Sequence, residues 1–163
     1  MDVDGTLTDG KIYMGSEGEL FKAFDIKDGA GIREILPMYG ICPVIITARE
    51  SKIVWNRCSE LNIVEVYQGV REKFKKLTEL LDIWSYRDKI RYTLKDVAYI
   101  GDDIMDLQCM KPLQKAGGII GCPADAIDEV KEICDYVSER DGGDGAVREF
   151  IRWLVKQREV VVM

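Results

Sequence analysis

The sequence predicts an α/β fold, a Rossmann-like parallel sheet with helices on both faces. Short apolar runs at 42–47, 97–100 and 118–120 are continuous and bounded by glycine or polar residues, as is typical of buried parallel strands. Amphipathic segments, with apolar residues three or four positions apart, lie between these runs, and this alternation favours a parallel sheet. The length of 163 residues, without repeats or low-complexity segments, predicts one domain over residues 1–163.

The first elements expected along the chain are a β-hairpin and a helix. Residues 11–24 hold two short apolar runs around a Gly-Ser-Glu-Gly sequence, which predicts a hairpin flap with a four-residue turn at 15–18. Helically spaced apolar residues follow, and we expect this helix to begin near Asp28 or Gly29. A proline in its last turn should end the helix near Gly40.

The central part of the chain continues the alternation. A helix with Ser51 as its N-cap follows the strand at 42–47. A short strand at 65–67 then precedes a helix with apolar residues spaced over 74–84. Residues 82–95 form a long link to the next strand, and we expect its aromatic residues to pack on the body or on a partner chain.

The two ends of the chain carry further expectations. The apolar strand that should lead into Asp2 is almost absent because the chain starts at Met1, so this central strand is either truncated or very short. The acidic N-terminus does not resemble a signal peptide. At the other end, a last amphipathic helix covers 147–155, and an apolar tail at 160–163 packs back on the fold or reaches a neighbouring subunit.

Charge and residue counts exclude several classes of function. The 29 acidic residues outnumber the 23 basic residues, and at a net charge of −6 nucleic acid is not expected as a partner. No apolar run approaches the roughly 18 residues of a membrane span, so we expect no membrane partner. The absence of histidine excludes Ser–His–Asp catalysis and histidine-based zinc sites. Five cysteines without a Cys-x-x-Cys pair indicate free thiols in the cytoplasm.

Two groups of carboxylates follow predicted strands. Asp2 and Asp4 stand two residues apart, and a later apolar run leads directly into Asp102, Asp103 and Asp106. Because ligands bind beyond the carboxyl ends of strands in open α/β sheets, we expect both groups at one edge. Either group alone fits surface charges or a helix cap as well as a site. Together, and without histidine or cysteine ligands, they predict a Mg²⁺ site that handles phosphate.

Two other residues are expected at the same edge of the sheet. Thr47 ends the strand at 42–47, where its hydroxyl and the following amides can hold a phosphoryl oxygen. Lys73 lies near a helix start after the strand at 65–67, and its ammonium can offset the charge of an aspartate nucleophile and a phosphate. Taken separately, a threonine at a strand end is usually structural, and a lysine in the first turn of a helix is usually solvated.

In this order, the DVDGT sequence, Thr47, Lys73 and the GDDIMD motif resemble the haloacid dehalogenase superfamily of aspartyl-phosphate phosphatases. The resemblance implies that Asp2 is the nucleophile and that Asp4 is the general acid–base. It also implies that Asp102 is a metal ligand, together with Asp2 and the backbone carbonyl of Asp4. Two further positions match residues that support the metal site: Asp103 and Asp106.

Longer stretches resemble one family of this superfamily, the 3-deoxy-D-manno-octulosonate 8-phosphate phosphatases. The stretches are DVDGTLTDGKIYMG, KAFDIKDGAGIRE, ITAR, NRCSELNI, YQGVREK, VAYIGDDIMDL and GGDGAVREF. The chain leaves no room for a cap domain, because only a hairpin and one helix separate Asp4 from Thr47. The resemblance implies Mg²⁺, a homotetramer and a role in lipopolysaccharide biosynthesis. It also implies a set of substrate-binding residues: Asp25, Lys27, Asp28, Gly29, Arg33, Arg49 and Arg57.

Two alternatives remain at this point. One is a phosphatase of a nine-carbon, sialic-acid-type 9-phosphate, whose relatives share the hairpin and the glycine-rich C-terminal motif. The other is a non-catalytic oligomerisation domain related to those of sugar-acid cytidylyltransferases. A domain kept only for assembly need not retain the acidic, Thr and Lys residues named above, which favours an enzyme. The apolar hairpin at 11–24 also predicts a homo-oligomer, because a free hairpin is marginal in water.

Overall fold

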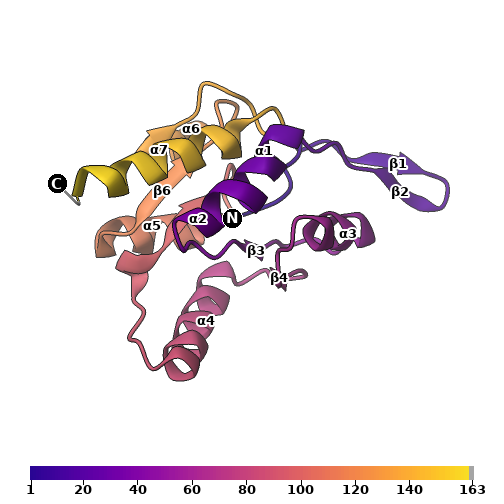
Figure 1. The fold of residues 1–163 in the computed structure, drawn as a ribbon. Coiled ribbons are helices and arrows are strands. Elements are labelled where there is room, and N and C mark those ends of the chain that lie inside the picture. The colour runs from indigo at the N-terminus through magenta and orange to yellow at the C-terminus, as the bar shows by residue number, and fades with distance from the viewer. Residues whose placement is uncertain (162–163) are drawn as a thin grey trace.

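The fold is a layered α/β structure with a hairpin that projects from one end of the body (Figure 1). A computed structural model describes residues 1–161, with side chains as far as Gln157. The strands are β1 (Tyr13–Gly15), β2 (Gly18–Phe21), β3 (Val44–Ile46), β4 (Glu65–Tyr67), β5 (Ala98–Ile100), β6 (Ile119–Cys122) and β7 (Tyr136–Val137). The α-helices are α1 (Ile26–Ala30), α2 (Leu36–Met38), α3 (Lys52–Glu60), α4 (Lys73–Asp88), α5 (Leu107–Ala116), α6 (Asp128–Lys131) and α7 (Ala146–Val161); a π-helical turn, η1 (Gly31–Ile35), joins α1 to α2, and a 3₁₀ turn, η2 (Leu94–Asp96), precedes β5.

The parallel sheet is built from two ladders that the N-terminus joins. Strand β3 pairs with β4, and β5, β6 and β7 form the second ladder, all in parallel. Between them, the Met1 ammonium donates to the Val44 carbonyl at 2.7 Å, and the Ile46 N–H donates to the Met1 carbonyl at 3.1 Å. On the other side, the Asp2 N–H donates to the Ile100 carbonyl at 3.1 Å. Met1 and Asp2 therefore hold the central position of the sheet, and burial lowers the pKa of the Met1 ammonium to about 6.

Helices cover both faces of this sheet, as the sequence predicts. Alternate strand residues point to opposite faces: Ile45 and Ile100 enter the core with α3 and α7, whereas Ile46 and Tyr99 enter the core with α4 and α5. The near-continuous apolar strands result from burial on both faces. No inserted cap domain separates these elements within residues 1–161.

The hairpin β1–β2 confirms the turn expected at 15–18, with Gly15 opposite Gly18 in an antiparallel ladder. Tyr13 and Phe21 stack across the strands with ring centroids 4.3 Å apart. The hairpin nevertheless leaves large apolar side chains half or more exposed: Ile12, Met14, Leu20 and Phe21. Such an apolar surface is unusual for a free flap.

The helix after the hairpin begins earlier than predicted. Helix α1 starts at Ile26, because the Asp25 carboxylate caps its N-terminus and accepts from the Lys27 N–H at 2.6 Å and from the Asp28 N–H at 3.2 Å. The expected start at Asp28 or Gly29 was therefore wrong by two to three residues. The predicted end near Gly40 is confirmed, since the last helical residue is Met38.

The predicted long link at 82–95 was also partly wrong, because α4 continues to Asp88 and only then turns at Lys89 (φ 57°). Trp84 packs on the body from this helix, and its indole N–H donates to the Glu65 carboxylate at 3.2 Å. Tyr86 on the same helix stays exposed.

The last helix, α7, reaches Val161 and so extends beyond the predicted range of 147–155. The contact predicted for the apolar tail at 160–163 lies outside the part whose side chains the structure describes. None of the described helices is long and apolar enough to cross a lipid bilayer.

Candidate active site

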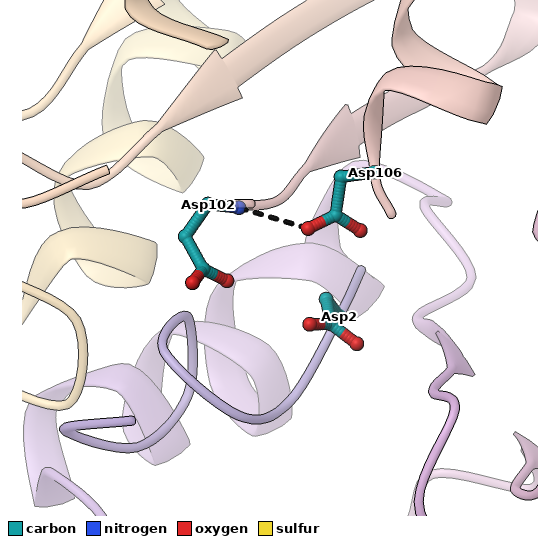
Figure 2. A group of neighbouring side chains, drawn as sticks. All are labelled: Asp2, Asp102 and Asp106. Atoms are coloured by element: carbon teal, nitrogen blue, oxygen red, sulfur yellow. Dashed lines mark hydrogen bonds between the residues drawn. The ribbon is translucent and has the colours of Figure 1, made fainter. Parts of the chain in front are cut away.

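Three carboxylates from distant parts of the chain meet at one edge of the sheet. Asp2 occupies the central position, Asp102 follows β5, and Asp106 stands immediately before α5. One ligand oxygen of each lies within 4.8 Å of the others, and Figure 2 shows the three carboxylates facing one another. One member of the first carboxylate group of the sequence, Asp2, therefore meets two members of the second, Asp102 and Asp106.

Asp106 organises the loop after β5. Its Oδ1 accepts from the Lys73 ammonium at 2.8 Å and from the Tyr99 hydroxyl at 2.6 Å. Its Oδ2 accepts from the Asp102 N–H at 3.0 Å (Figure 2) and from the Asp103 N–H at 3.2 Å. Both oxygens are thus engaged in buried hydrogen bonds, which supports a role in holding the loop in place.

Lys73 is the first residue of α4 and supplies the cation of the cluster. Its side chain is 1% exposed, and its Nζ lies 2.8 Å from carboxylate oxygens of both Asp2 and Asp106. Burial disfavours the ammonium, but the two carboxylates raise the Lys73 pKa above its usual value, so it stays charged. Burial and the Asp106 charge raise the pKa of Asp2, while Lys73 acts in the opposite direction.

Asp102 is held from the N-terminal loop. The Thr6 hydroxyl donates to Asp102 Oδ1 at 2.8 Å. Burial raises the pKa of Asp102 to about 8, and the neighbouring carboxylates add to the effect. Gly5 has a positive φ of 91°, and a Cβ at this position would stand 2.0 Å from Asp102 Oδ2. The Asp-Gly-Thr sequence therefore needs its glycine so that Asp102 can approach the loop.

The donor set fits a hard divalent cation. Three carboxylates lie together and one ammonium contacts two of them, so three ionised carboxylates would leave negative charge that burial makes costly. All of the candidate ligand atoms are oxygens, as Mg²⁺ prefers. The exposed Asp103 side chain instead accepts from the Ile104 N–H at 2.7 Å, so it does not take part in this oxygen cluster.

Thr47 lies where the sequence expects it, at the end of β3 beside the central segment, and is 2% exposed. Its N–H donates to the Tyr67 carbonyl at 3.0 Å, and its carbonyl accepts from the Val70 N–H at 2.9 Å. These backbone bonds fix the end of the strand, which the Ile46 N–H joins to the Met1 carbonyl.

Asp4 belongs to a second group of charges. Its Oδ1 accepts from the Lys22 ammonium, and its Oδ2 lies 3.8 Å from Arg49 Nε. Glu19 of β2 completes the group, at 3.0 Å from Lys22 and 3.6 Å from Arg49. Sequence reasoning missed Lys22 and Glu19. Strand alternation gives no hint of this pair, because it would place residues 19 and 22 on opposite faces.

Comparison with known proteins decides the identity of the chain. No family model matches it. The 3-deoxy-D-manno-octulosonate 8-phosphate phosphatase KdsC of Salmonella typhi is 42% identical over 149 residues, which is 91% of this chain and 73% of that protein. The chain belongs to the KdsC family of 3-deoxy-D-manno-octulosonate 8-phosphate phosphatases. It is therefore a phosphatase of the haloacid dehalogenase superfamily.

Solved structures of KdsC-family relatives agree. The cobalt-bound enzyme from Haemophilus influenzae superposes with a TM-score of 0.82 at 34% identity, covering 95% of this chain and 84% of that one. The enzyme from Moraxella catarrhalis, in complex with a magnesium ion, a phosphate ion and a KDO molecule, has a TM-score of 0.81 at 37% identity, with coverages of 96% and 83%. Enzymes of this superfamily use a divalent metal, and the oxygen cluster of this chain suits one.

The family resemblance also marked residues of α1, and the structure gives these residues local roles. Asp25 caps α1, and Lys27 is exposed. Asp28 is 1% exposed, and its Oδ1 accepts from the Arg148 N–H at the start of α7 at 2.7 Å. A Cβ at Gly29 would stand 2.4 Å from the Arg57 guanidinium, so this position brings α1 close to α3.

The three arginines that the resemblance marked lie at different places. Arg49 contacts Asp4, and Arg57 lines an open groove of about 460 Å³ between the hairpin base and α3. Arg33 lies elsewhere, where its guanidinium approaches the Glu60 carbonyl at 3.4 Å. We call this space the α3 groove; its lining residues are Lys22, Phe24, Ile26, Ile53, Asn56, Arg57 and Glu60.

Proposed function

We propose that this phosphatase hydrolyses 3-deoxy-D-manno-octulosonate 8-phosphate through an aspartyl-phosphate formed on Asp2. The observation that carries the proposal is the arrangement of Asp2 against Lys73, with Asp4 two residues later in contact with Lys22, which lines the α3 groove. The names of its KdsC relatives support the choice of substrate.

The chemistry divides into two balanced steps. A carboxylate oxygen of Asp2 attacks phosphorus, the bond to the sugar oxygen breaks, and Asp4 gives its proton to that oxygen. Water then attacks the aspartyl-phosphate, Asp4 takes the proton from the water, and the bond between phosphorus and Asp2 breaks to release phosphate. Lys73 stabilises the negative charge beside Asp2 throughout, because its ammonium contacts both Asp2 and Asp106.

A divalent metal ion, for which we propose Mg²⁺, would be held by Asp2, Asp102 and the backbone carbonyl of Asp4. When bound, it supplies positive charge that offsets the carboxylates and the phosphate. Asp106 would keep the loop of Asp102 in place, and Asp103 would support the site without entering the cluster of ligand oxygens. Thr47 would hold a phosphoryl oxygen through its hydroxyl.

The α3 groove suits the sugar acid. Its volume falls within the range of small-molecule sites. Arg57 and Lys22 line the groove and Arg49 lies beside it, so cations surround a ligand that carries both a carboxylate and a phosphate. Ile53 and Phe24 supply apolar surface for the carbon chain. Lys27, Asp28 and Gly29 would contribute indirectly, by placing Arg57.

The test is phosphate release from 3-deoxy-D-manno-octulosonate 8-phosphate, a nine-carbon sugar-acid 9-phosphate and p-nitrophenyl phosphate, with Mg²⁺ and after chelation. We expect the highest kcat/KM on the eight-carbon acid and a loss of at least about 100-fold on chelation that Mg²⁺ restores. A higher kcat/KM on the nine-carbon acid would favour the sialic-acid-type alternative. Absence of hydrolysis of every substrate would favour the oligomerisation domain.

We also propose that the enzyme is a homo-oligomer, most simply a tetramer, with the hairpin at 11–24 in the interface. The exposed apolar side chains of this hairpin, Leu20 among them, support the proposal. Light scattering at micromolar concentration should give the mass of four chains, and Leu20→Ser should lower it while the exposed Lys11→Ser on the same hairpin should not. A fully active monomer would contradict the proposal.

The compartment we propose is the cytoplasm. All five cysteines are free, including the buried Cys58, Cys109 and Cys122. Free thiols persist in a reducing compartment, which is what the sequence predicted. Thiol titration of the unfolded protein, prepared without reductant from cytoplasmic extract, should find five thiols, and any disulfide would argue against this location.

A further inference from the structure

The hairpin brings a buried lysine, Lys22, into contact with Asp4. Lys22 directly follows β2, and its side chain is 1% exposed. Its Nζ donates to Asp4 Oδ1 and lies 3.0 Å from Glu19 Oε1. The buried ammonium is thus held between two carboxylates, those of Asp4 and Glu19.

The two oxygens of Asp4 therefore have different environments. A lysine ammonium has three donors and no acceptor, so Asp4 Oδ1 must accept from Lys22 whether Asp4 is neutral or ionised. Arg49 Nε stands 3.8 Å from Oδ2, which is beyond hydrogen-bond distance. Lys22 therefore engages Oδ1, and Oδ2 is the oxygen of Asp4 that is left to meet a leaving group.

The position of Lys22 depends on how the hairpin docks. Glu19 of β2 holds Lys22 from the side opposite Asp4, and it also accepts from the Ser51 hydroxyl, which caps α3. Lys22 also lines the α3 groove. The hairpin base, the groove and the proposed acid–base are thus joined by one chain of charged contacts.

We propose that Lys22 is a positioning residue for proton transfer, which fixes Asp4 so that Oδ2 delivers the proton to the leaving oxygen of the substrate. This inference rests on the proposed function, in which Asp4 is the general acid–base. The lysine itself gives up no proton. It orients Asp4 and ties that orientation to the seating of the hairpin.

The test compares two leaving groups. Substitution Lys22→Met keeps the length and the apolar stem but removes the donor. We expect kcat/KM on the sugar-acid phosphate, whose alkoxide needs a proton, to fall about 10- to 100-fold, part of what general acid catalysis contributes. On p-nitrophenyl phosphate, whose anion leaves without a proton, kcat/KM should fall less than about threefold. Because kcat/KM reports steps up to departure of the leaving group, later steps do not obscure the comparison.

Matched variants separate the outcomes. Lys11→Met removes an exposed lysine from the same hairpin and should change neither kcat/KM, whereas Lys22→Arg should recover part of the lost sugar-acid activity. If Lys22→Met fails to fold, Glu19→Gln, which weakens the hold on Lys22, should give the same imbalance at about 3- to 10-fold. Equal losses on both substrates, or none, would overturn the inference.

Asp4→Asn distinguishes failure of the inference from failure of the proposed function. If Asp4→Asn produces the imbalance between leaving groups and neither Lys22→Met nor Glu19→Gln does, Asp4 is the acid and Lys22 does not position it. If Asp4→Asn affects both substrates equally, the acid–base role of Asp4 is wrong, and the inference falls with it.

Discussion

Two buried lysines of this phosphatase have nearly the same local chemistry but different supports. Each side chain is 1% exposed and contacts two carboxylates. Lys73 lies between Asp2 and Asp106, whose side chains are 10% and 1% exposed. Lys22 lies between carboxylates that are 20% and 17% exposed, those of Asp4 and Glu19.

The two lysines differ in the structural elements that hold each of them and its two carboxylates. The Lys73 pair stands on the sheet edge and the start of α4, in the packed centre of the fold. The Lys22 pair joins the catalytic loop to a hairpin that projects from the body (Figure 1). The packed fold thus fixes the charge around Asp2, the proposed nucleophile, whereas the position of Asp4, the proposed general acid–base, depends on how the hairpin docks.

The largest effect is expected from Asp2→Asn in the cluster around Lys73, because this substitution removes the carboxylate that we propose as the nucleophile. We expect kcat to fall at least about 10³-fold, the scale of losing a principal catalytic group. The fold should survive, because the substitution leaves the backbone N–H at this position free to donate to the Ile100 carbonyl as before. Steady-state phosphate release in Mg²⁺ measures the loss. Retention of more than a tenth of the wild-type activity would contradict the aspartyl-phosphate mechanism.

Lys73→Met should give the next largest effect and the sharpest contrast with Lys22→Met. Removing the ammonium leaves Asp2 and Asp106 facing each other in a buried site, so we expect kcat/KM to fall about 10²- to 10³-fold. The loss should be the same for the sugar-acid phosphate and p-nitrophenyl phosphate, since Lys73 stabilises charge whatever group leaves. A loss that depends on the leaving group would remove the distinction between the two lysines.

This contrast also marks what the sequence could predict. Lys73 and the carboxylates were predictable because each follows a strand, and parallel strands bring their carboxyl ends to one edge. Lys22 was not, because its place depends on how the hairpin docks on α3. The extension of α4 to Asp88 was missed because apolar spacing ends at Trp84, although the helix continues on its exposed face.

Arg49→Ala should have a smaller effect, and it tests the cluster of charges around Lys22. Arg49 is 3.8 Å from Asp4 and 3.6 Å from Glu19, and its side chain is 42% exposed, so it can meet a ligand carboxylate. We expect KM for the sugar-acid phosphate to rise about tenfold, while KM for p-nitrophenyl phosphate hardly changes. Arg57→Ala should act alike, and Arg33→Ala, outside the α3 groove, is the control. Equal losses on both substrates would assign Arg49 to the fold or to phosphoryl transfer.

The last prediction concerns stability and not activity, and a buried carboxylate for which the described residues supply no lysine contact. Asp28 Oδ1 accepts from the Arg148 N–H, whereas its buried Oδ2 has no hydrogen-bond partner among the described residues. Burial raises the pKa of Asp28 to about 6, compared with an ordinary value of 3.8. The folded state therefore binds this proton more tightly than the unfolded state does. Its contribution to stability is complete below about pH 4 and is lost as the pH rises through about 6.

Asp28→Asn should abolish this loss, because an amide stays neutral and can still accept from the Arg148 N–H. The free energy of unfolding of the wild type, relative to the variant, should fall by about 2–3 kcal/mol between pH 4 and pH 7. Urea unfolding at each pH measures it, with the exposed Asp82→Asn as a control for losing one negative charge. The opposite result is that the free energy of unfolding of the wild type rises with pH relative to the variant. In that case the N-terminus of α7 stabilises the Asp28 anion by more than burial costs. Asp28 would then need no lysine, unlike Asp2 and Asp4.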